Sequence, residues 1–544
     1  MLGGCAPPRL RHVVSSLGVI VASAGVLVLA PAASAAQLCV GPGGGCHSTI
    51  QGAVNAANNG DRIKVKRGTY DGGVTINVSV KLTGAGAKRT VIRGGGPVLT
   101  IGTYGAQREP SVLIDRVKIT GGITRSSPES VPFTGEGGVF AAGGGISIPP
   151  NEDFDGGAKV TVRHSVITHN RVAPDHTLPF GPTCPDGNPC PFAFAGGGGI
   201  DSWGKLTLSH TSVHHNRVGS ASGLSTVTSD ADGGGITSRL SGLTITHSRI
   251  RANKATATGP EGRFAEGGGI YAPGGRVTIR RSSVIGNRAV LNASLPGSVD
   301  QLAIGGGLQI ADDVTGVRIS HAKITRNAAR MTNRVGGATA NSGGLNVTTV
   351  NIPFRITKSV IARNAVTATA QNHSRGNALV DTGGATLAGK VSQVRIRDNT
   401  ATAKSAGGHA TASGGAALIL GRMVNSTVTD NSVHASSPRG KARAAGGGLE
   451  VDLKRLTVRE TTIARNAASA RGRRGVARGG GIFNARLYST GARLVLIDTD
   501  VRHNLAKGPA RIRRQGGGIY AHRRPVDVTR SAIEDNVPDN CFGC

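Results

Sequence analysis

The chain has 544 residues and a formal net charge of +32, and it contains 84 Gly and 24 Pro residues. Gly and Pro together make up about 20% of the chain, which is below the roughly 25–30% typical of low-complexity disorder. Only 3% of the residues are aromatic, so the composition excludes a core built around large rings, and the excess of Gly favours an array of repeats.

Residues 1–35 have the pattern of a secretory signal peptide. Arg9 and Arg11 precede an apolar run from Val19 to Ala30, and Ala33-Ser34-Ala35 is a small-x-small cleavage motif. The apolar run is too short to cross a membrane comfortably. We therefore expect a secreted, extracellular protein without a transmembrane anchor, with retention at the cell wall as a further expectation.

Six cysteines follow this leader, and they fall into three close pairs. Short separations and an oxidising compartment favour pairing within each pair. Zinc binding at residues 541–544 is the alternative, but a second C-x-x-C motif to complete such a site is absent. The predicted disulfides are Cys39–Cys46, Cys184–Cys190 and Cys541–Cys544.

A repeat occupies most of the remaining chain. Eleven segments end with a β-branched residue, two variable residues and Asn, at a mean spacing of about 37 residues. Counting back from Asn, position −3 is Val or Ile and position −8 is apolar in all eleven, and position −5 is Ser or Thr in nine. A Gly cluster precedes each Asn. The asparagines are Asn170, Asn216, Asn253, Asn287, Asn327, Asn364, Asn399, Asn431, Asn466, Asn504 and Asn536.

Single inward residues separated by polar ones indicate short strands with alternating faces. We expect Asn to take the left-handed conformation at the turn between strands, and Gly to allow the bend into the next strand. About 23 residues then form one coil of three strands, such as 267–289, and the other dozen residues of each period are expected to loop out. Stacked coils pair in parallel at roughly 4.8 Å.

The segments Thr49-Ile50-Gln51, Gly60-Asp61, Gly68-Thr69-Tyr70 and Leu82-Thr83-Gly84 resemble the opening of the pectin-lyase-like β-helix proteins. The Gly-Gly-Gly-Ile and Ile-x-x-Asn units resemble repeats of polymorphic outer-membrane-type proteins. The resemblance implies an all-β, single-stranded right-handed parallel β-helix (solenoid) with a short capping helix near residues 50–57. It implies a cap over 36–70, coils over 71–536 and a disulfide-tied tail over 537–544.

The resemblance also implies two forms of catalysis, since this fold hosts hydrolases and lyases. Hydrolysis would need paired carboxylates, and β-elimination would need carboxylates on Ca²⁺ with a basic residue. Residues two places after each Gly cluster are expected to face outward, and among them Asp201 and Glu450 lie several coils apart. The catalytic residues are therefore unknown from the sequence. No cofactor is expected unless the protein is a lyase that uses Ca²⁺.

The motif Arg62-Ile63-Lys64 is similar to one of the polygalacturonases, but it lies in the predicted cap and the accompanying motifs are absent. Another group, Asp201, Trp203, Arg239 and Tyr271, is expected on adjacent coils and could bind a sugar ring. A scatter of unrelated surface residues is the alternative, and we favour it.

Position −6 gives a column of His164, His210 and His247, followed by Arg281 and His321. Stacked imidazoles could share a metal ion or form a pH-sensitive strip. The column continues with residues of every charge, which favours a solvated turn, and no metal site is predicted.

Residues 439–530 hold 21 basic and six acidic residues. Residues at equivalent points of successive coils emerge on one side, so they are expected to form a basic patch near the C-terminal end. Arginine-rich coding bias and solubility are the alternative explanation. The patch residues are Arg439, Lys441, Arg443, Arg471, Arg473, Arg474, Arg478, Arg511, Arg513 and Arg514.

The sequence therefore favours a secreted, non-catalytic surface or matrix protein that binds anionic polymers, such as an acidic cell-wall or extracellular polysaccharide. Aromatic residues do not alternate with the basic ones, so a dedicated nucleic-acid site is not expected. A polysaccharide lyase or glycoside hydrolase acting on acidic polysaccharide is the alternative. The oligomeric state is not indicated.

Overall fold

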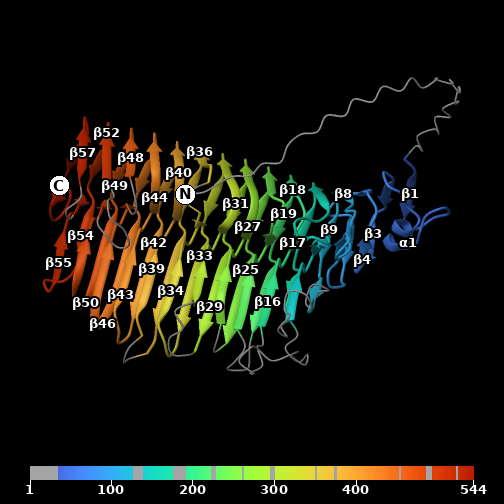
Figure 1. Ribbon diagram of the computed structural model, residues 1–544, viewed down its shortest axis with the longest axis horizontal. Coiled ribbons are helices and arrows are strands. Elements are labelled where there is room, and N and C mark those ends of the chain that lie inside the picture. The colour runs from blue at the N-terminus through green and yellow to red at the C-terminus, as the bar shows by residue number, and fades with distance from the viewer. Residues whose placement is uncertain are drawn as a thin grey trace, which may run out of the picture. The chain divides into compact units, whose positions relative to one another are not determined.

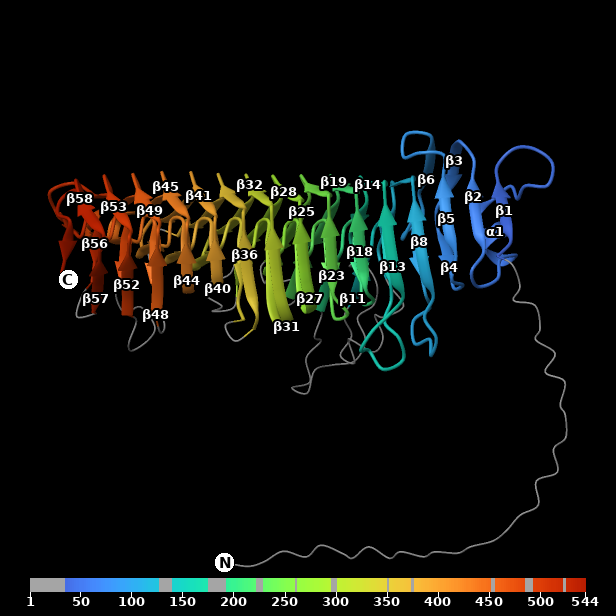
Figure 2. The same ribbon diagram turned by 90° about the horizontal axis from the view of Figure 1, so that it is seen from above.

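The computed structural model describes residues 35–126, 139–174, 192–221, 228–259, 262–294, 301–349, 352–372, 376–451, 455–484, 493–521 and 525–544. Residues 36–544 form one compact unit. Its strands pair in parallel and stack in chain order, as Figures 1 and 2 show. The unit is a right-handed parallel β-helix, as predicted, and α1 (Ile50–Asn55) is the only helix within the described ranges.

The first sheet contains two parallel ladders that share four long strands. Strands that directly follow the Gly turns are β4 Val74–Ile76, β7 Leu99–Ile101, β12 Ile146–Ile148, β17 Ile200–Ser202, β22 Ile236–Ser238, β35 Leu345–Val347, β47 Leu449–Val451, β51 Ile482–Asn484, β56 Ile519–Tyr520 and β59 Cys541–Phe542. The adjoining ladder contains β1 Gln37–Val40, β2 Arg62–Val65, β5 Lys81–Gly84, β8 Ser111–Asp115, β13 Lys159–Arg163, β18 Leu206–Ser209, β23 Leu243–Thr246, β36 Phe354–Thr357, β48 Arg455–Arg459, β52 Arg493–Ile497 and β57 Val526–Thr529. The shared strands are β27 Ile270–Arg280, β31 Leu308–Ser320, β40 Ala385–Ser392 and β44 Ala417–Val424.

The second sheet carries, from β14 onward, the strands that end two residues before the Asn residues, and three earlier strands precede them. They are β3 Gly68–Asp71, β6 Thr90–Arg93, β9 Lys118–Thr120, β14 Val166–Thr168, β19 Ser212–His214, β24 Arg249–Arg251, β28 Ser283–Ile285, β32 Lys323–Thr325, β37 Val360–Ala362, β41 Arg395–Arg397, β45 Thr427–Thr429, β49 Thr462–Ala464, β53 Asp500–Arg502 and β58 Ala532–Glu534.

The third sheet follows the Asn residues, and most of its coils contribute an outgoing and a returning strand. Outgoing strands are β10 Ile123–Thr124, β15 Arg171–Val172, β20 Arg217–Ala221, β25 Lys254–Gly259, β29 Arg288–Ala293, β33 Ala328–Asn333, β38 Ala365–Ala370, β42 Thr400–Ser405 and β54 Leu505–Lys507. Returning strands are β11 Val139–Ala142, β16 Phe192–Gly196, β21 Thr228–Asp232, β26 Gly262–Glu266, β30 Leu302–Ile304, β34 Ala338–Asn341, β39 Ala378–Asp381, β43 Ala410–Ser413 and β55 Ile512–Gln515. Two strands, β46 Ser432–Ala445 and β50 Ala467–Arg478, contain both directions.

This third sheet corrects one prediction, because most of the described residues between an Asn and the next Gly cluster form strands and do not loop out. Alternate residues of the outgoing and returning strands are buried against each other, and most of them are Ala. Ala257 on β25 and Ala265 on β26 belong to this second core, which is separate from the Val/Ile/Leu core inside the coils. Short methyl side chains allow the two layers to pack closely, which explains the Ala-rich and Gly-rich composition of these segments.

The main core follows the predicted columns. Position −3 is buried from Ile167 to Val501, and position −8 is buried from Val162 to Leu496. The last coil departs from the pattern, since Val528 is 46% exposed at the C-terminal end. At position −5, Ser and Thr hydroxyls accept hydrogen bonds from backbone N–H groups of the preceding coil, as Ser282 Oγ does from Ser248 N at 3.1 Å.

The Asn residues correct a second prediction, because they are not the left-handed residues. Each is buried, and its amide joins a continuous ladder: Asn287 Nδ2 donates to Asn327 Oδ1 at 3.0 Å, and Asn327 Nδ2 donates to Asn364 Oδ1 at 3.0 Å. The left-handed conformation belongs to the residue before each Asn, such as His169 (φ +56°), and to position −6, such as His164 (φ +47°). Position −6 is therefore a turn, as the mixed charges of its column indicate.

The ends of the solenoid differ. At the N-terminal end α1 buries Ile50, Ala53 and Val54, and its first turn is capped by the Thr49 hydroxyl, which accepts from Gly52 N at 3.0 Å. The first sheet begins with β1, inside the segment predicted as the cap, and ends with β59, inside the predicted tail.

Two of the predicted disulfides are formed, Cys39–Cys46 and Cys541–Cys544. The predicted pair Cys184–Cys190 and all of the predicted leader except Ala35 lie outside the described residues. Within the described ranges, no helix is long and apolar enough to cross a membrane.

Candidate functional site

A corner runs along the solenoid between the strands that follow the Gly turns and the returning strands of the third sheet. The first Gly of a cluster forms the bend with positive φ, +58° at Gly233 and +53° at Gly267. Residues two places after the cluster were expected to be exposed, but the returning strands cover them. Thr237, for example, is fully buried, and its hydroxyl accepts from Gly197 N and donates to Asp232 O.

The structure brings the predicted cluster of Asp201, Trp203 and Arg239 together in this corner. The Arg239 guanidinium donates to Asp201, with Nη2–Oδ1 at 3.0 Å and Nε–Oδ2 at 3.4 Å. It also lies 4.9–5.2 Å from the ring centroids of Phe140, Phe194 and Trp203. The preferred expectation of a surface scatter is therefore wrong.

An open platform for a sugar ring is not formed either. Trp203 and Asp201 are 5% and 1% exposed, and Arg239 covers the indole face. Tyr271 lies nearby on β27, where its hydroxyl hydrogen-bonds Glu266. Burial and the neighbouring acids raise the pKa of that hydroxyl.

Sequence reasoning missed three acids in the same corner, namely Asp230, Asp232 and Glu266. Burial raises the pKa of Asp230 to about 7, although Arg263 and the Phe264 N–H oppose the shift. Burial first, and then repulsion from Glu266 and Asp230, raises the pKa of Asp232 well above its ordinary range. Burial also raises the pKa of Asp201, against the opposing effect of Arg239. Part of this cluster is therefore protonated near neutral pH.

A sequence signal for these acids existed, because Asp232 and Glu266 are the residues immediately before their Gly clusters. Since the chain reverses at the Gly turn, the residue before a cluster faces the residue two places after it. Asp232 and Glu266 are also register partners on adjacent coils. One oxygen of Asp232 has no hydrogen-bond partner among the described residues.

These acids do not form a calcium site. Arg239 already occupies both oxygens of Asp201. In the part of the chain that the structure describes, no three His, Cys, Asp or Glu side chains are placed to hold a metal ion. Calcium-assisted elimination therefore has no matching ligand set in these residues.

Nine of the ten predicted patch residues lie on β46, β50 and β55 of the third sheet, not on loops, and Arg511 lies in the turn between β54 and β55. Arg439 lies within a register shift between Ser437 and Lys441 of β46, and after the shift Lys441 pairs with Arg474 of β50. Arg513 and Arg514 lie on β55, in register with Val476 and Ala477. Arg478 points into the corner, where its guanidinium lies 4.5 Å from the ring centroid of Tyr520.

The patch residues influence one another electrostatically. Arg443, more than any other neighbour, lowers the pKa of the Lys441 ammonium, and Arg474 and Arg478 add to the effect. Burial, with Arg443 and Arg513, lowers the pKa of Arg478. No ion pair joins any of the ten residues to an acid among the described residues. Five of the ten residues, Lys441, Arg443, Arg474, Arg478 and Arg513, therefore lie close enough to influence one another, and no ion pair with an acid of the described residues neutralises them.

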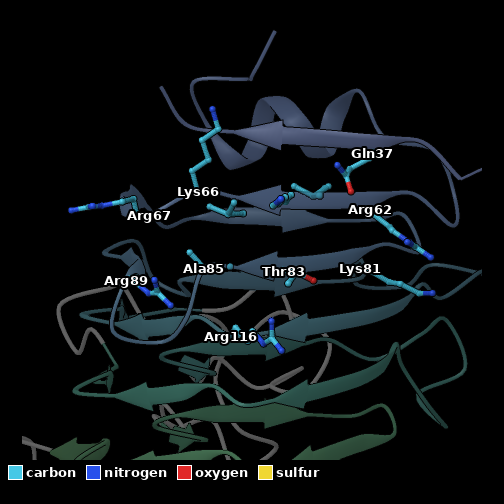
Figure 3. A pocket seen from close by; sticks show the side chains of 13 residues that line it. Gln37, Arg62, Lys66, Arg67, Lys81, Thr83, Ala85, Arg89 and Arg116 are labelled. Atoms are coloured by element: carbon cyan, nitrogen blue, oxygen red, sulfur yellow. The ribbon is translucent and has the colours of Figure 1, made fainter. Parts of the chain in front are cut away.

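A second cationic surface lies at the N-terminal end, where the outer face of β2 and β5 forms a pocket (Figure 3). It has a volume of about 620 Å³ and is lined by seven Arg and Lys residues and by no Asp or Glu. Arg62 and Lys81 extend at one end, and Arg67 and Arg89 at the other. Lys64, which with Arg62 belongs to the discounted Arg-Ile-Lys motif, lies between them on β2.

No family model matches the chain, and no curated protein matches its sequence. A solved structure, the A-module of mannuronan C-5 epimerase AlgE6 from Azotobacter vinelandii, is similar with a TM-score of 0.28 and 10% identity, over 88% of this chain and 93% of that module.

Proposed function

We propose that this chain is a secreted, non-catalytic β-helix protein, of the pectin-lyase-like type, that binds acidic polysaccharide through its cationic surfaces. The observation that carries the proposal is the group of Lys441, Arg443, Arg474, Arg478 and Arg513, which repel one another without an acidic partner among the described residues. Holding like charges close together costs free energy. A bound polyanion offsets this repulsion, so the group favours binding of a polyanion. The cavity of Figure 3 repeats the same chemistry at the other end.

Charge reversal tests the proposal. Arg473, Arg474, Arg513 and Arg514 are each changed to Glu, and retention on immobilised polygalacturonate is measured over a range of salt concentrations. The control reverses Arg318, Arg355, Lys390 and Arg422, a column of exposed cations on the first sheet, and so makes the same change in net charge. We expect retention to be lost in the patch variant and largely kept in the control.

Retention of the wild-type protein on the polymer should also weaken as the salt concentration rises, because binding releases counterions. Equal retention of both variants and wild type would contradict the role of the patch. Equal loss in both variants would show that net charge, rather than this group of residues, governs binding.

A second function, hydrolysis of a glycosidic bond, is favoured by one observation. Asp232 and Glu266 lie on adjacent coils, burial and mutual repulsion raise the pKa of Asp232, and one Asp232 oxygen lacks a partner among the described residues. Two carboxyl groups on adjacent coils, one of them with a raised pKa, are the kind of pair that general acid–base hydrolysis uses.

This second function is tested by incubating the wild type and D232N with polygalacturonate, alginate and a neutral glucan, with and without Ca²⁺. Unsaturated uronate and new reducing ends are followed over time. Reducing ends formed only by the wild type, without unsaturated uronate, would establish hydrolysis. Unsaturated product would indicate elimination, and the absence of both products would leave binding as the function.

A further inference from the structure

Six histidines gather on the outer face of the second sheet, around β14, β19 and β24. They occupy two turn columns and one strand position. We call this surface the histidine face, and its imidazoles are His164, His169, His210, His214, His215 and His247.

The first row follows position −6 on three successive coils. The His164 and His210 rings are stacked with centroids 5.2 Å apart, and the His210 and His247 rings with centroids 4.8 Å apart. The spacing is that of neighbouring strands in a sheet. At the end of the row, His164 Nδ1 lies 3.1 Å from Asp115 Oδ1.

The second row lies at the other end of the same strands, just after β14 and β19. The His169 and His215 rings are stacked with centroids 5.2 Å apart, and His214 Nδ1 lies 2.8 Å from His215 Nδ1. The Thr168 hydroxyl contacts Nδ1 of His169 at 2.8 Å and Nδ1 of His214 at 2.9 Å. Two ring nitrogens that face each other at 2.8 Å share one proton, so this contact requires at least one neutral ring.

The surroundings of both rows are strongly cationic. In the described segments 115–126, 159–174, 206–221, 243–259 and 277–294, Asp115 is the only acid, and it is buried and paired with Arg163 and His164. The cations on the same or adjoining strands and turns include Arg116, Lys118, Arg163, Arg171, Arg217, Arg249, Arg251, Lys254, Arg280 and Arg281.

Burial and these neighbours lower the pKa of three of the rings. Burial first, then Arg251, His215, His169 and Lys118, lowers the pKa of His214 to about 4. Burial, His169, Arg251 and Arg217 lower the pKa of His215. On the other row, burial, His210, Arg281 and Arg280 lower the pKa of His247. Positive potential therefore opposes protonation as long as the face is free.

We propose that the histidine face is a second binding surface for acidic polysaccharide, and that binding there takes up protons and strengthens as the pH falls. An anionic polymer on the face supplies the negative charge that the rings lack, so protonation and binding favour each other. A divalent cation is a poorer fit, because at least ten fixed cations repel it. Nucleic acid is also a poorer fit, because the rings stack on one another and offer no free platform to bases.

The choice of ligand class rests on the proposed function, but the surface is separate from the C-terminal patch and can be tested separately. The probe is dextran sulfate, whose sulfates keep their charge between pH 5.5 and 7.5. Affinity is measured by calorimetry at both pH values and at several salt concentrations, in two buffers with different ionisation enthalpies, which reports the protons taken up. We expect affinity on the order of tenfold higher at pH 5.5 and a log–log salt slope steeper by about two.

The test variant changes His164, His169, His210, His215 and His247 to Asn. The chain itself shows that these turns accept other short polar residues, since Asn425 occupies position −6 at φ +49° and Asp430 precedes Asn431 at φ +60°. The matched control changes His321 and His503 to Asn, at the same two turn positions on other coils (φ +51° and +54°). Thermal melts confirm that all variants are folded.

The five-site variant should lose the gain in affinity at pH 5.5 and the proton uptake, and should keep the binding seen at pH 7.5. The control should behave like the wild type. The C-terminal Arg-to-Glu variant should lose binding at pH 7.5 and keep the gain at pH 5.5, so that the two proposals can fail independently. A gain that survives in the five-site variant, or no gain in the wild type, would overturn the proposal.

Discussion

Asp230 illustrates how burial in the corner sets the properties of single residues. Its side chain is buried, and its carboxylate accepts from Phe264 N at 3.1 Å. Its pKa rises from 3.8 to about 7 because the cost of desolvation exceeds the stabilisation from Arg263 and that hydrogen bond. A carboxyl group with a raised pKa favours the folded state only while it is protonated. Its contribution is therefore full below about pH 4 and is lost as the pH rises to about 7.

The variant D230N should remove this dependence, because an amide keeps the acceptor for Phe264 N–H and carries no charge. Relative to the wild type, its free energy of unfolding should increase between pH 4 and 7, by at most about 4 kcal/mol. Guanidinium unfolding at a series of pH values measures the difference, and D71N, at an exposed position, is the control. A constant difference across this range would show that Asp230 is ionised throughout.

For single residues, the sequence predicted which positions repeat better than it predicted what their side chains do. The Asn column was recognised, but a local turn preference was assigned to side chains that form a buried ladder across coils. Their partners are about 32 to 46 residues away, so local preference gives no information on them. The acids of the corner were missed for a similar reason. Asp232 meets Glu266 only when adjacent coils stack, and it meets Asp201 only because the chain reverses at the Gly turn.

At the scale of elements, the third sheet depends on matched volumes across its alanine core. Where the outgoing strand carries Met331, the returning strand carries Ala340, and on the next coil Ala368 accompanies Val380. The alternation of Ala with polar residues in 365–370 and 400–405 is a strand pattern. The sequence therefore contained the signal for this sheet, but the predicted coil of about 23 residues did not include these segments.

The variant A368L should overfill this core and lower the free energy of unfolding by about 1–3 kcal/mol. Adding V380A should restore much of the loss, because the pair then reproduces the volumes found at Met331 and Ala340. T367L places the same side chain on the outer face of β38 and is the control. Chemical unfolding measures all three, and an unchanged A368L would show that the two layers are not packed against each other.

At the scale of the whole molecule, each coil contacts only its neighbours, so the cost of a defect depends on its position. Ile324 lies in the middle of the position −3 column, buried between Val284 and Ile361. Ile533 occupies the same column in the last coil, where it is partly buried and pairs only with Val501. The same substitution at the two sites therefore shows how much of the loss of stability depends on having a neighbouring coil on both sides.

The variant I324D places an unpaired carboxylate in the main core and should cost more than about 4 kcal/mol, whereas I533D should cost much less. Limited proteolysis should cut I324D near the centre of the solenoid and leave two large fragments, because coils on either side still have intact neighbours. The same treatment of I533D should remove only the last coil. Equal losses of stability at both sites would contradict nearest-neighbour stacking, since a defect at the end would then destabilise the whole array as much as one at the centre.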